Sequence, residues 1–214
     1  MAVTLPSGST LQIASAYGAA KTITAITNAN PGEASAVGHG FAAADIIELT
    51  SGWQRLNGRI VRVGPAPAAD KFKLDTMDTS DTKTYPAGLG VGSARAVSGW
   101  VPMPQVLEFN TNGGETTYAN YKFLESDEEQ QIPSGRSAMS IAIKLADDPT
   151  LPCYAVLRAA SDSRKPTAML LTLPNGGVLL YNGYVSFNDT PELSQGNIMS
   201  VKVSFSLIGR PTRY

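Results

Sequence analysis

The sequence has one cysteine, Cys153, and one histidine, His39, among its 214 residues. A single cysteine cannot form an internal disulfide, and a single histidine cannot serve both a catalytic triad and a metal site. A Cys–His pair is conceivable, but His39 lies between two glycines in an expected turn, and Cys153 fits a predicted helix as a small apolar residue. We therefore predict that the protein is not an enzyme and uses neither a cofactor nor a metal.

Charged residues are also scarce. They make up 16% of the chain, against about a quarter in ordinary soluble proteins, and the net charge is −1. Tight binding of nucleic acid needs clustered lysines and arginines, and the sequence contains no run of them. Because charge is depleted at the centres of protein interfaces, this composition suits a protein covered by copies of itself. Secreted β-proteins share the composition, so it does not decide the matter.

Long apolar runs and targeting signals are absent as well. No apolar stretch approaches the length that spans a bilayer, and residues 1–6 show no basic segment followed by an apolar one. We expect no membrane segment, and synthesis in a cytoplasm. The acidic run 125–129 lacks the spaced ligands of a calcium loop, and the glycine-rich segment 88–92 lacks the lysine of a phosphate loop.

Strand signals dominate what is present. Runs rich in Val, Ile, Thr, Phe and Tyr alternate with Gly, Pro, Asn and Asp. We divide the chain into an N-terminal arm (1–21) with one strand at Thr10–Ala14, a compact β-module (22–98) and a larger β-domain (99–214). The module resembles a small barrel or sandwich. Its predicted strands are Thr22–Thr27, Ala34–Val37, Ile46–Thr50, Arg59–Val63, Lys71–Leu74 and Ser93–Val97.

The larger domain carries the one predicted helix, at 149–160. Asp148 is the expected N-cap, and Pro149 fits the first helical position. A polar stretch at 111–135 is too long for an ordinary connection, so it is expected to be functional or disordered. The predicted strands of this domain are Gln105–Asn110, Ser137–Leu145, Ala168–Leu173, Val178–Phe187 and Met199–Ile208.

Apolar and polar side chains alternate along several late strands. Ile141, Ile143 and Leu145 would point one way, while Ala142 and Lys144 point the other. This period of two predicts sheets that are buried on one face and wet on the other. The wet faces carry mostly short, uncharged side chains. Composition alone leaves two readings open, an ordinary solvated surface or the lining of a channel.

The ordered set of elements at 149–214 resembles the major tail tube proteins of lambda-like, non-contractile long-tailed bacteriophages. A helix containing proline is followed by a strand that ends in Leu173-Pro174-Asn175-Gly176. Next come a strand through Tyr181-Asn182-Gly183-Tyr184 and a last strand closing with Ile208-Gly209-Arg210-Pro211. The module resembles a small β-module recurrent in phage virion proteins, through segments such as Gly38-His39-Gly40-Phe41 and Leu56-Asn57-Gly58-Arg59.

This resemblance implies an all-β fold with one helix, a β-sandwich whose subunits share an inner β-barrel in hexameric rings, with the module inserted on the outside. Stacked rings would form the tube in the virion tail through which DNA is ejected. It implies inner strands at 104–110, 137–145, 178–187 and 200–208. The implied lumen-facing residues are Glu108, Asn110, Ala138, Ser140, Ala142, Lys144, Lys202, Ser204 and Ser206.

The long stretch 111–135 matches the flexible acidic loop of these proteins. Together with the arm 1–21 it is expected to bridge successive rings, with Glu125, Asp127, Glu128 and Glu129 as stacking residues. These acids would pair with basic groups on the next ring or keep the lumen negative. Implied partners are other copies of the chain, a tape measure protein in the lumen, terminator and tail-tip proteins at the ends, and DNA in transit.

A different class of function stays open. The chain could be a virion or tail-tip module that does not polymerise and uses residues 22–98 to bind a glycan or receptor on the host surface. A hydrolase is disfavoured, because the sequence offers no arrangement of nucleophile and base.

Overall fold

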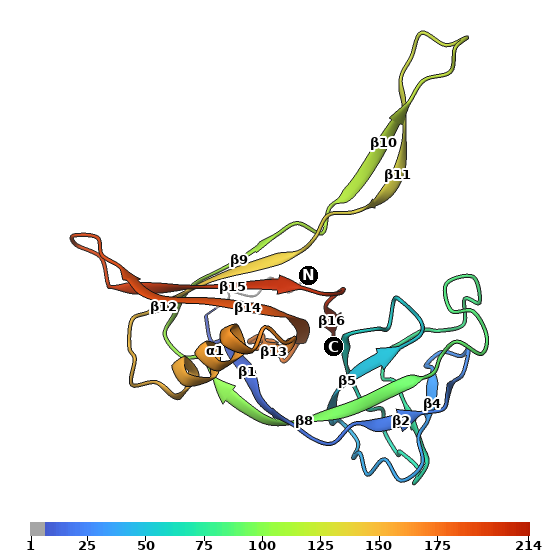
Figure 1. Ribbon diagram of the computed structural model, residues 1–214, viewed down its shortest axis with the longest axis horizontal. Helices are drawn as coiled ribbons and strands as arrows, with labels where there is room; N and C mark the ends of the chain where they lie inside the picture. The colour runs from blue at the N-terminus through green and yellow to red at the C-terminus, as the bar shows by residue number, and fades with distance from the viewer. Residues whose placement is uncertain (1–6) are drawn as a thin grey trace.

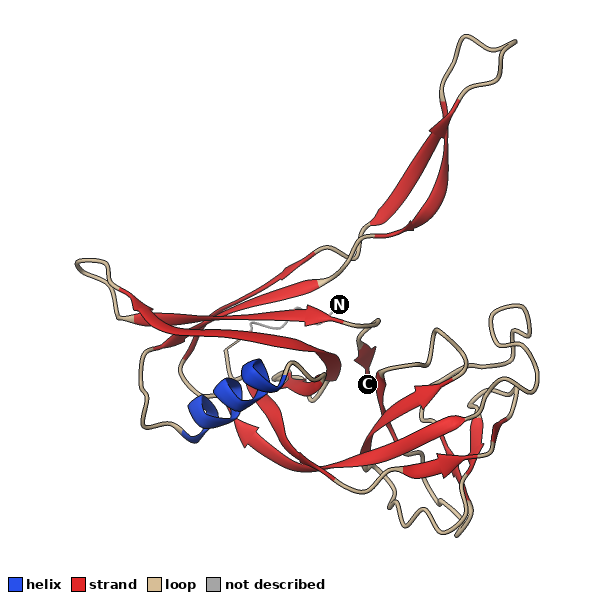
Figure 2. Cartoon of the chain, viewed as in Figure 1, coloured by secondary structure: helices blue, strands red, loops and turns tan. Residues whose placement is uncertain are grey.

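The computed structural model describes residues 7–214, which form sixteen strands and one helix. The protein is mostly β, as predicted (Figure 2). Its main sheet has eleven strands, of which nine follow the order β6-β5-β8-β1-β13-β14-β15-β12-β9, while β16 pairs with β14 and β2 with β8. The sheet curls around the helix α1 into a half-barrel (Figure 1). Every strand pair in it is antiparallel.

The body of the chain is built from β1, β8, β9, β12–β16 and α1. These elements are β1 (Thr10–Tyr17), β8 (Gly92–Pro102), β9 (Val106–Asn112), β12 (Ser140–Ala146), α1 (Pro152–Ser163), β13 (Thr167–Thr172), β14 (Val178–Glu192), β15 (Ser200–Leu207) and β16 (Thr212–Arg213). The predicted alternation holds in β12 and β15, where every second residue is buried. Their apolar side chains share one hydrophobic core with Cys153, Tyr154 and Leu157 of α1, which itself packs mainly against β14, so the helix lies on this side of the sheet.

The N-terminal segment is part of this body. Residues 1–6 lie outside the described part of the chain, but Thr10–Tyr17 forms β1 in the middle of the main sheet, between β8 and β13. Leu11 and Ile13 are buried in the main core. The arm was expected to bridge rings, and for residues 10–17 that expectation is wrong. The physical reason is that alternate apolar side chains of this segment complete the subunit's own core.

The module has a separate core and is tied to the body by β8. Its strands are β2 (Lys21–Ile23), β3 (Ala25–Ile26), β4 (Glu33–Ser35), β5 (Ile46–Ser51), β6 (Arg59–Arg62) and β7 (Lys71–Lys73), close to the predicted positions. The core contains Trp53, Phe72 and Leu74. The strand β8 begins in the module and runs into the body, where it pairs with β1.

A polar network fixes the module against the body. Arg95 donates to Glu48 (Nε–Oε2 2.5 Å), whose side chain is only 8% exposed. Asn182 of β14 donates through Nδ2 to Glu48 Oε1 (3.2 Å) and to the carbonyl oxygen of Gly58 (2.8 Å). At the C-terminus, the Tyr214 hydroxyl accepts a hydrogen bond from the Arg62 backbone N–H (2.8 Å). These contacts hold the two parts in one orientation.

The predicted helix at 149–160 begins later, at Pro152, and runs to Ser163. A start at Pro149 would place Pro152 at the fourth helical position, where a backbone N–H is needed for the first intrahelical bonds. Starting at Pro152 removes that conflict. Asp148 is not the cap; its Oδ1 accepts hydrogen bonds from N and Oγ1 of Thr150 (3.2 and 2.6 Å), in the turn before the helix.

The long stretch expected to be a flexible loop is a β-hairpin. Strands β10 (Thr116–Tyr121) and β11 (Gln130–Arg136) form a separate two-stranded sheet that projects far from the body (Figure 1). At its base, Gly113 and Gly114 both have φ of +80°, and a Cβ on Gly113 would collide with the Ala138 carbonyl oxygen. The hairpin therefore leaves the sheet through a turn that favours glycine.

Candidate functional site

One face of β9, β12, β15 and β14, the face that points away from the main core, carries mostly polar side chains. Strand pairing arranges its side chains in rows across the sheet. Along one row Lys144 lies between Glu108 and Lys202; along the next, Ala142 lies between Asn110 and Ser204. A third row joins Ser140 to Ser206 and to Asn112. Apart from the charged row and Tyr184 of β14, the face carries mostly short neutral side chains.

Eight of the nine predicted lumen residues lie on this face, namely Glu108, Asn110, Ser140, Ala142, Lys144, Lys202, Ser204 and Ser206. Ala138 does not, because β12 begins only at Ser140. The structure adds Tyr184, Ser186 and Asn188 from β14, which lie opposite Ser206, Ser204 and Lys202. Apolar and polar side chains alternate along the sequence after Gly183, and this pattern could have identified these three residues.

Two lysines lie directly opposite each other in the charged row. Like charges in facing strand positions repel, and here Glu192 offsets the repulsion. Its carboxylate pairs with Lys202 and lies 3.9 Å from Lys144 Nζ. The hydrogen bond from Lys202 holds the pKa of Glu192 below its usual range. Glu192 is ionised at neutral pH like any exposed glutamate, and because its pKa is lowered it protonates only at a more acidic pH than a free glutamate does.

Removing this carboxylate should make the face attract polyanions. For Glu192→Gln we expect severalfold tighter binding of labelled single-stranded DNA at low salt, because two lysines per subunit lose their counter-charge. Fluorescence anisotropy against salt concentration measures the effect. The wild-type protein should bind the DNA as tightly as this variant only at acidic pH, where Glu192 becomes protonated. Glu33→Gln is the matched control, since it breaks the Glu33–Lys71 pair (3.3 Å) in the module. Equal binding by both variants would contradict the prediction.

The four-stranded face ends in two edges without a strand partner in the described chain. One is the outer edge of β9, and the other is the part of β14 beyond Gly183, where pairing with β13 stops. On the second edge, the backbone N–H of Phe187 donates to Ser161 Oγ of α1 (3.3 Å). Open strand edges are templates for pairing with another chain.

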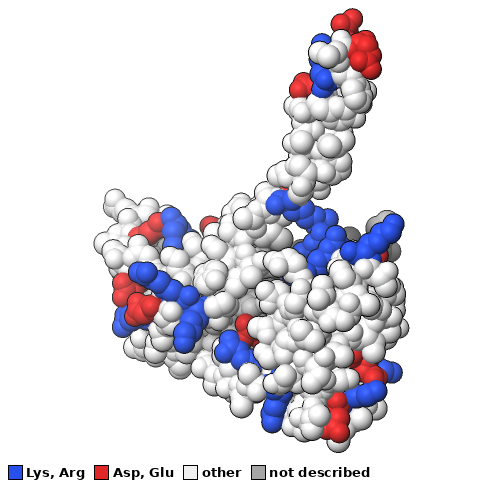
Figure 3. Space-filling view, turned by 45° about the vertical axis from the view of Figure 1, so that its right-hand side comes forward, with Lys and Arg blue, Asp and Glu red and all other residues white. Residues whose placement is uncertain are grey.

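The hairpin tip gathers the four predicted stacking residues. Glu125, Asp127, Glu128 and Glu129 are all exposed there, between β10 and β11. Figure 3 shows acidic side chains at this tip. Two large apolar side chains lie beside them, Phe123 at 52% and Leu124 at 105% exposure. The tip thus combines exposed acidic and exposed apolar side chains.

The Cys–His alternative is not supported by the positions of the two residues. Cys153 is buried in the main core, and burial raises the pKa of its thiol, which makes it a poor nucleophile. His39 lies in the module, where Nδ1 accepts from the Phe41 N–H (2.9 Å) and Nε2 contacts the Ala68 carbonyl oxygen (2.7 Å). Its ring also packs against Phe41 and Phe72. Both residues are structural.

Across positions 7–214, no three His, Cys, Asp or Glu side chains are grouped so as to hold a metal ion. Within the same residues α1 is the one helix, and it is not long and apolar enough to cross a membrane.

The arrangement defines a structural β-protein, with a curled sheet, one polar face between two open edges and a projecting hairpin. Comparison with protein families agrees with this class. The family model described as phage tail tube protein, TTP, matches residues 51–214, well over half of the chain. The chain therefore belongs to the phage tail tube protein family, whose members are structural proteins that assemble into the tube of the virion tail. A search of curated protein sequences finds no match.

Proposed function

We propose that six copies of the chain close into a ring, and that stacked rings form the tail tube of a long-tailed, non-contractile phage. The observation that carries the proposal is the polar face bounded by open edges. Since β9, β12, β15 and β14 alternate in direction, β9 of one copy meets β14 of the next as an antiparallel pair. An even number of strands per copy lets the pattern repeat around a closed barrel.

The dimensions fit a conduit for DNA. Four strands from each of six copies give twenty-four strands, and at a spacing of about 4.8 Å and a tilt near 40° the backbone barrel would be about 48 Å across. A duplex passes through such a channel. The wall facing it would be the polar face, where short serine and alanine side chains and neutralised lysines offer DNA few attachment points.

The remaining parts take up positions consistent with this wall. The helix covers the sheet face opposite the lumen, and we place the module of residues 22–98 on the outside of the tube. The projecting hairpin, with its acidic and apolar tip, would contact neighbouring copies and order the stack. A tape measure protein would fill the lumen before ejection, with terminator and tail-tip proteins at the two ends.

A proline in the open edge of β9 tests ring closure. The hydrogen bond from Leu207 N to Met139 O fixes which residues of β12 point toward β15, and by alternation Thr111 of β9 directs its N–H to the open edge. Thr111→Pro removes that N–H without breaking the subunit's own ladder. We expect a folded monomer that forms no tubes, seen by negative-stain microscopy and gel filtration. Thr111→Ala, which keeps the N–H, should assemble. Normal tubes from the proline variant would refute pairing through this edge.

A further inference from the structure

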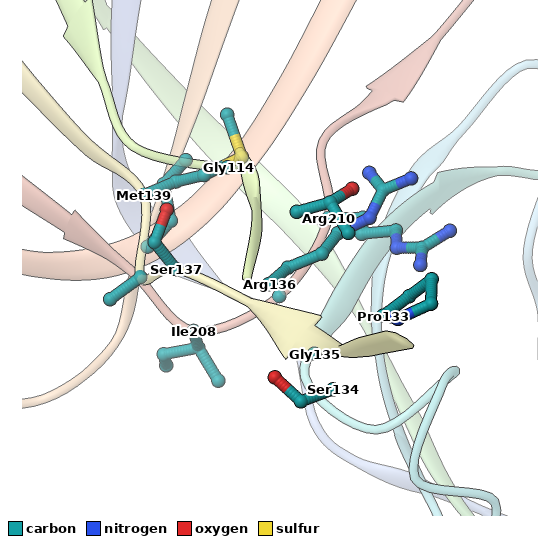
Figure 4. Close-up of a pocket in the computed structure, with 13 residues that line it drawn as sticks. Gly114, Pro133, Ser134, Gly135, Arg136, Ser137, Met139, Ile208 and Arg210 are labelled. Atoms are coloured by element: carbon teal, nitrogen blue, oxygen red, sulfur yellow. The ribbon is translucent and has the colours of Figure 1, made fainter. Parts of the chain in front are cut away.

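A basic hollow lies where the hairpin joins the body. Its volume is about 720 Å³, and it is lined by both hairpin strands, by the last residue of β15 and by residues 208–210. Two arginines, Arg136 and Arg210, direct their guanidinium groups to the same side of it (Figure 4). No Asp or Glu lines the hollow, and neither arginine has an ion pair within residues 7–214.

A second hollow continues the positive surface. Arg210 also lines it, together with Arg55 and Arg59 from the module. Burial lowers the pKa of the Arg59 guanidinium, and the nearby charge of Arg210 lowers it further. The Nε of Arg59 is buried and has no hydrogen-bond partner in the described structure. Four guanidinium groups thus share one end of the molecule. The charge of Arg55 acts on Asp81 and helps to lower its pKa, whereas Arg59, Arg136 and Arg210 form no ion pair within residues 7–214.

The matching anions are at the hairpin tip. Its four acids, Glu125, Asp127, Glu128 and Glu129, form no ion pair with any described residue. In the space-filling view acidic side chains gather at the tip with basic atoms beside them, and further basic side chains lie at the base (Figure 3). The exposed Lys122 precedes the four acids, so the tip carries a net negative charge. The hairpin strands are six and seven residues long, so tip and base are about 20 Å apart. Because the strands between them are held by hydrogen bonds, the hairpin cannot bend back, and its acidic tip cannot reach the arginines at its own base.

We propose that the hairpin tip of one copy docks on the arginine-lined hollows at the hairpin base of another copy. This inference rests on the self-assembly proposed above and names the surface that receives the hairpin. The complementarity includes apolar groups. Met139 and Ile208 line the first hollow, and Ile208 is 41% exposed, so Phe123 and Leu124 of the incoming tip would find apolar contacts beside the arginines. Complementary charge of this kind guides association and fixes register.

Charge reversal at each surface, and at both together, tests the proposal. Arg136→Glu with Arg210→Glu should raise the subunit concentration needed for tube formation by at least about tenfold, which corresponds to 1.4 kcal/mol. Changing the four tip acids to Lys should do the same. A chain with both sets of changes should assemble again, because attraction is restored with the signs exchanged. Light scattering and electron microscopy give the readouts, and circular dichroism checks that each variant folds. Lys83→Glu, an exposed module site, is the control for charge alone.

The outcomes separate this inference from the proposed function. If the unaltered chain forms tubes and the arginine variant does so equally well, docking on the hollow is wrong while the tube stands. If the arginine variant fails and the doubly reversed chain does not recover, the hollow binds some other anion, and the inference is overturned. If the unaltered chain forms no tubes under any condition, the proposed function fails first.

Discussion

A chain whose hairpin is replaced by a two-residue turn is expected to fold normally and to form no tubes. The replacement would remove residues 116–136 and join Glu115 to Ser137 through Asn-Gly. These ends are already adjacent, since Ser137 N donates to Glu115 O (2.9 Å). The hairpin has its own sheet and contributes no residue to the three hydrophobic cores, so its loss leaves the body packed. Negative-stain microscopy and the thermal unfolding midpoint measure the two expectations.

The control keeps the hairpin and weakens it slightly. Tyr121→Phe removes the hydrogen bond from the Tyr121 hydroxyl to Gln130 Oε1 (2.6 Å) but leaves the ladder and the tip intact. This variant should assemble. Tubes of normal length from the chain without a hairpin would show that stacking uses other surfaces, and the bridging role would have to be abandoned.

The largest effect on stability is expected at Gly183. This residue is buried in β14, and a Cβ added there would collide with the Ser206 carbonyl oxygen and approach Phe205 to 2.9 Å. Because Ser206 is held by pairing with both β14 and β12, its backbone cannot move away. We expect Gly183→Val to cost about 4 kcal/mol, at the upper end of single substitutions. The unfolding midpoint should fall by about 10 °C for a chain of this size.

Gly135 provides the comparison. It also lies in a strand, but a Cβ there would meet only Thr117 Oγ1, at 3.4 Å. Gly135→Ala should leave the midpoint within about 1 °C. If Gly183→Val unfolded at the wild-type temperature, the close approach of β14 to β15 would not exist in solution.

Much of the main sheet was predictable because its side chains alternate. Period-two patterns in β12 and β15 placed Ile141 and Val203 in the core and Ala142 and Ser204 on the polar face. The buried face also fixes the register of strand pairing, because a shift by one residue would turn all the apolar side chains of a strand toward solvent. The resemblance to tail tube proteins at 149–214 is confirmed by the family match over 51–214, while the narrower likeness to lambda-like phages stays a prediction. Its ordered turns and strands, more than any single motif, carried that prediction.

The errors occurred where local signals compete. Two prolines three positions apart both fit a helix start, and only the packing of Tyr154 and Leu157 on the sheet agrees with the later one. The segment 111–135 shows no apolar periodicity, since both faces of its hairpin are exposed, so its strands went unseen. In the first twenty residues the apolar pattern was short, and nothing local indicated that β1 would lie in the middle of the sheet.

The sequence by itself determined the β class, the polar and apolar faces and the acidic tip, because these depend on spacing along one strand or on composition. The tertiary structure decided what no local pattern contains: which strands lie at open edges, how Glu192 comes to neutralise Lys144 and Lys202, and how Arg55, Arg136 and Arg210 gather at the hairpin base. Such groups come from segments far apart in the chain. Their meeting depends on long-range pairing and core packing, which are properties of the whole fold.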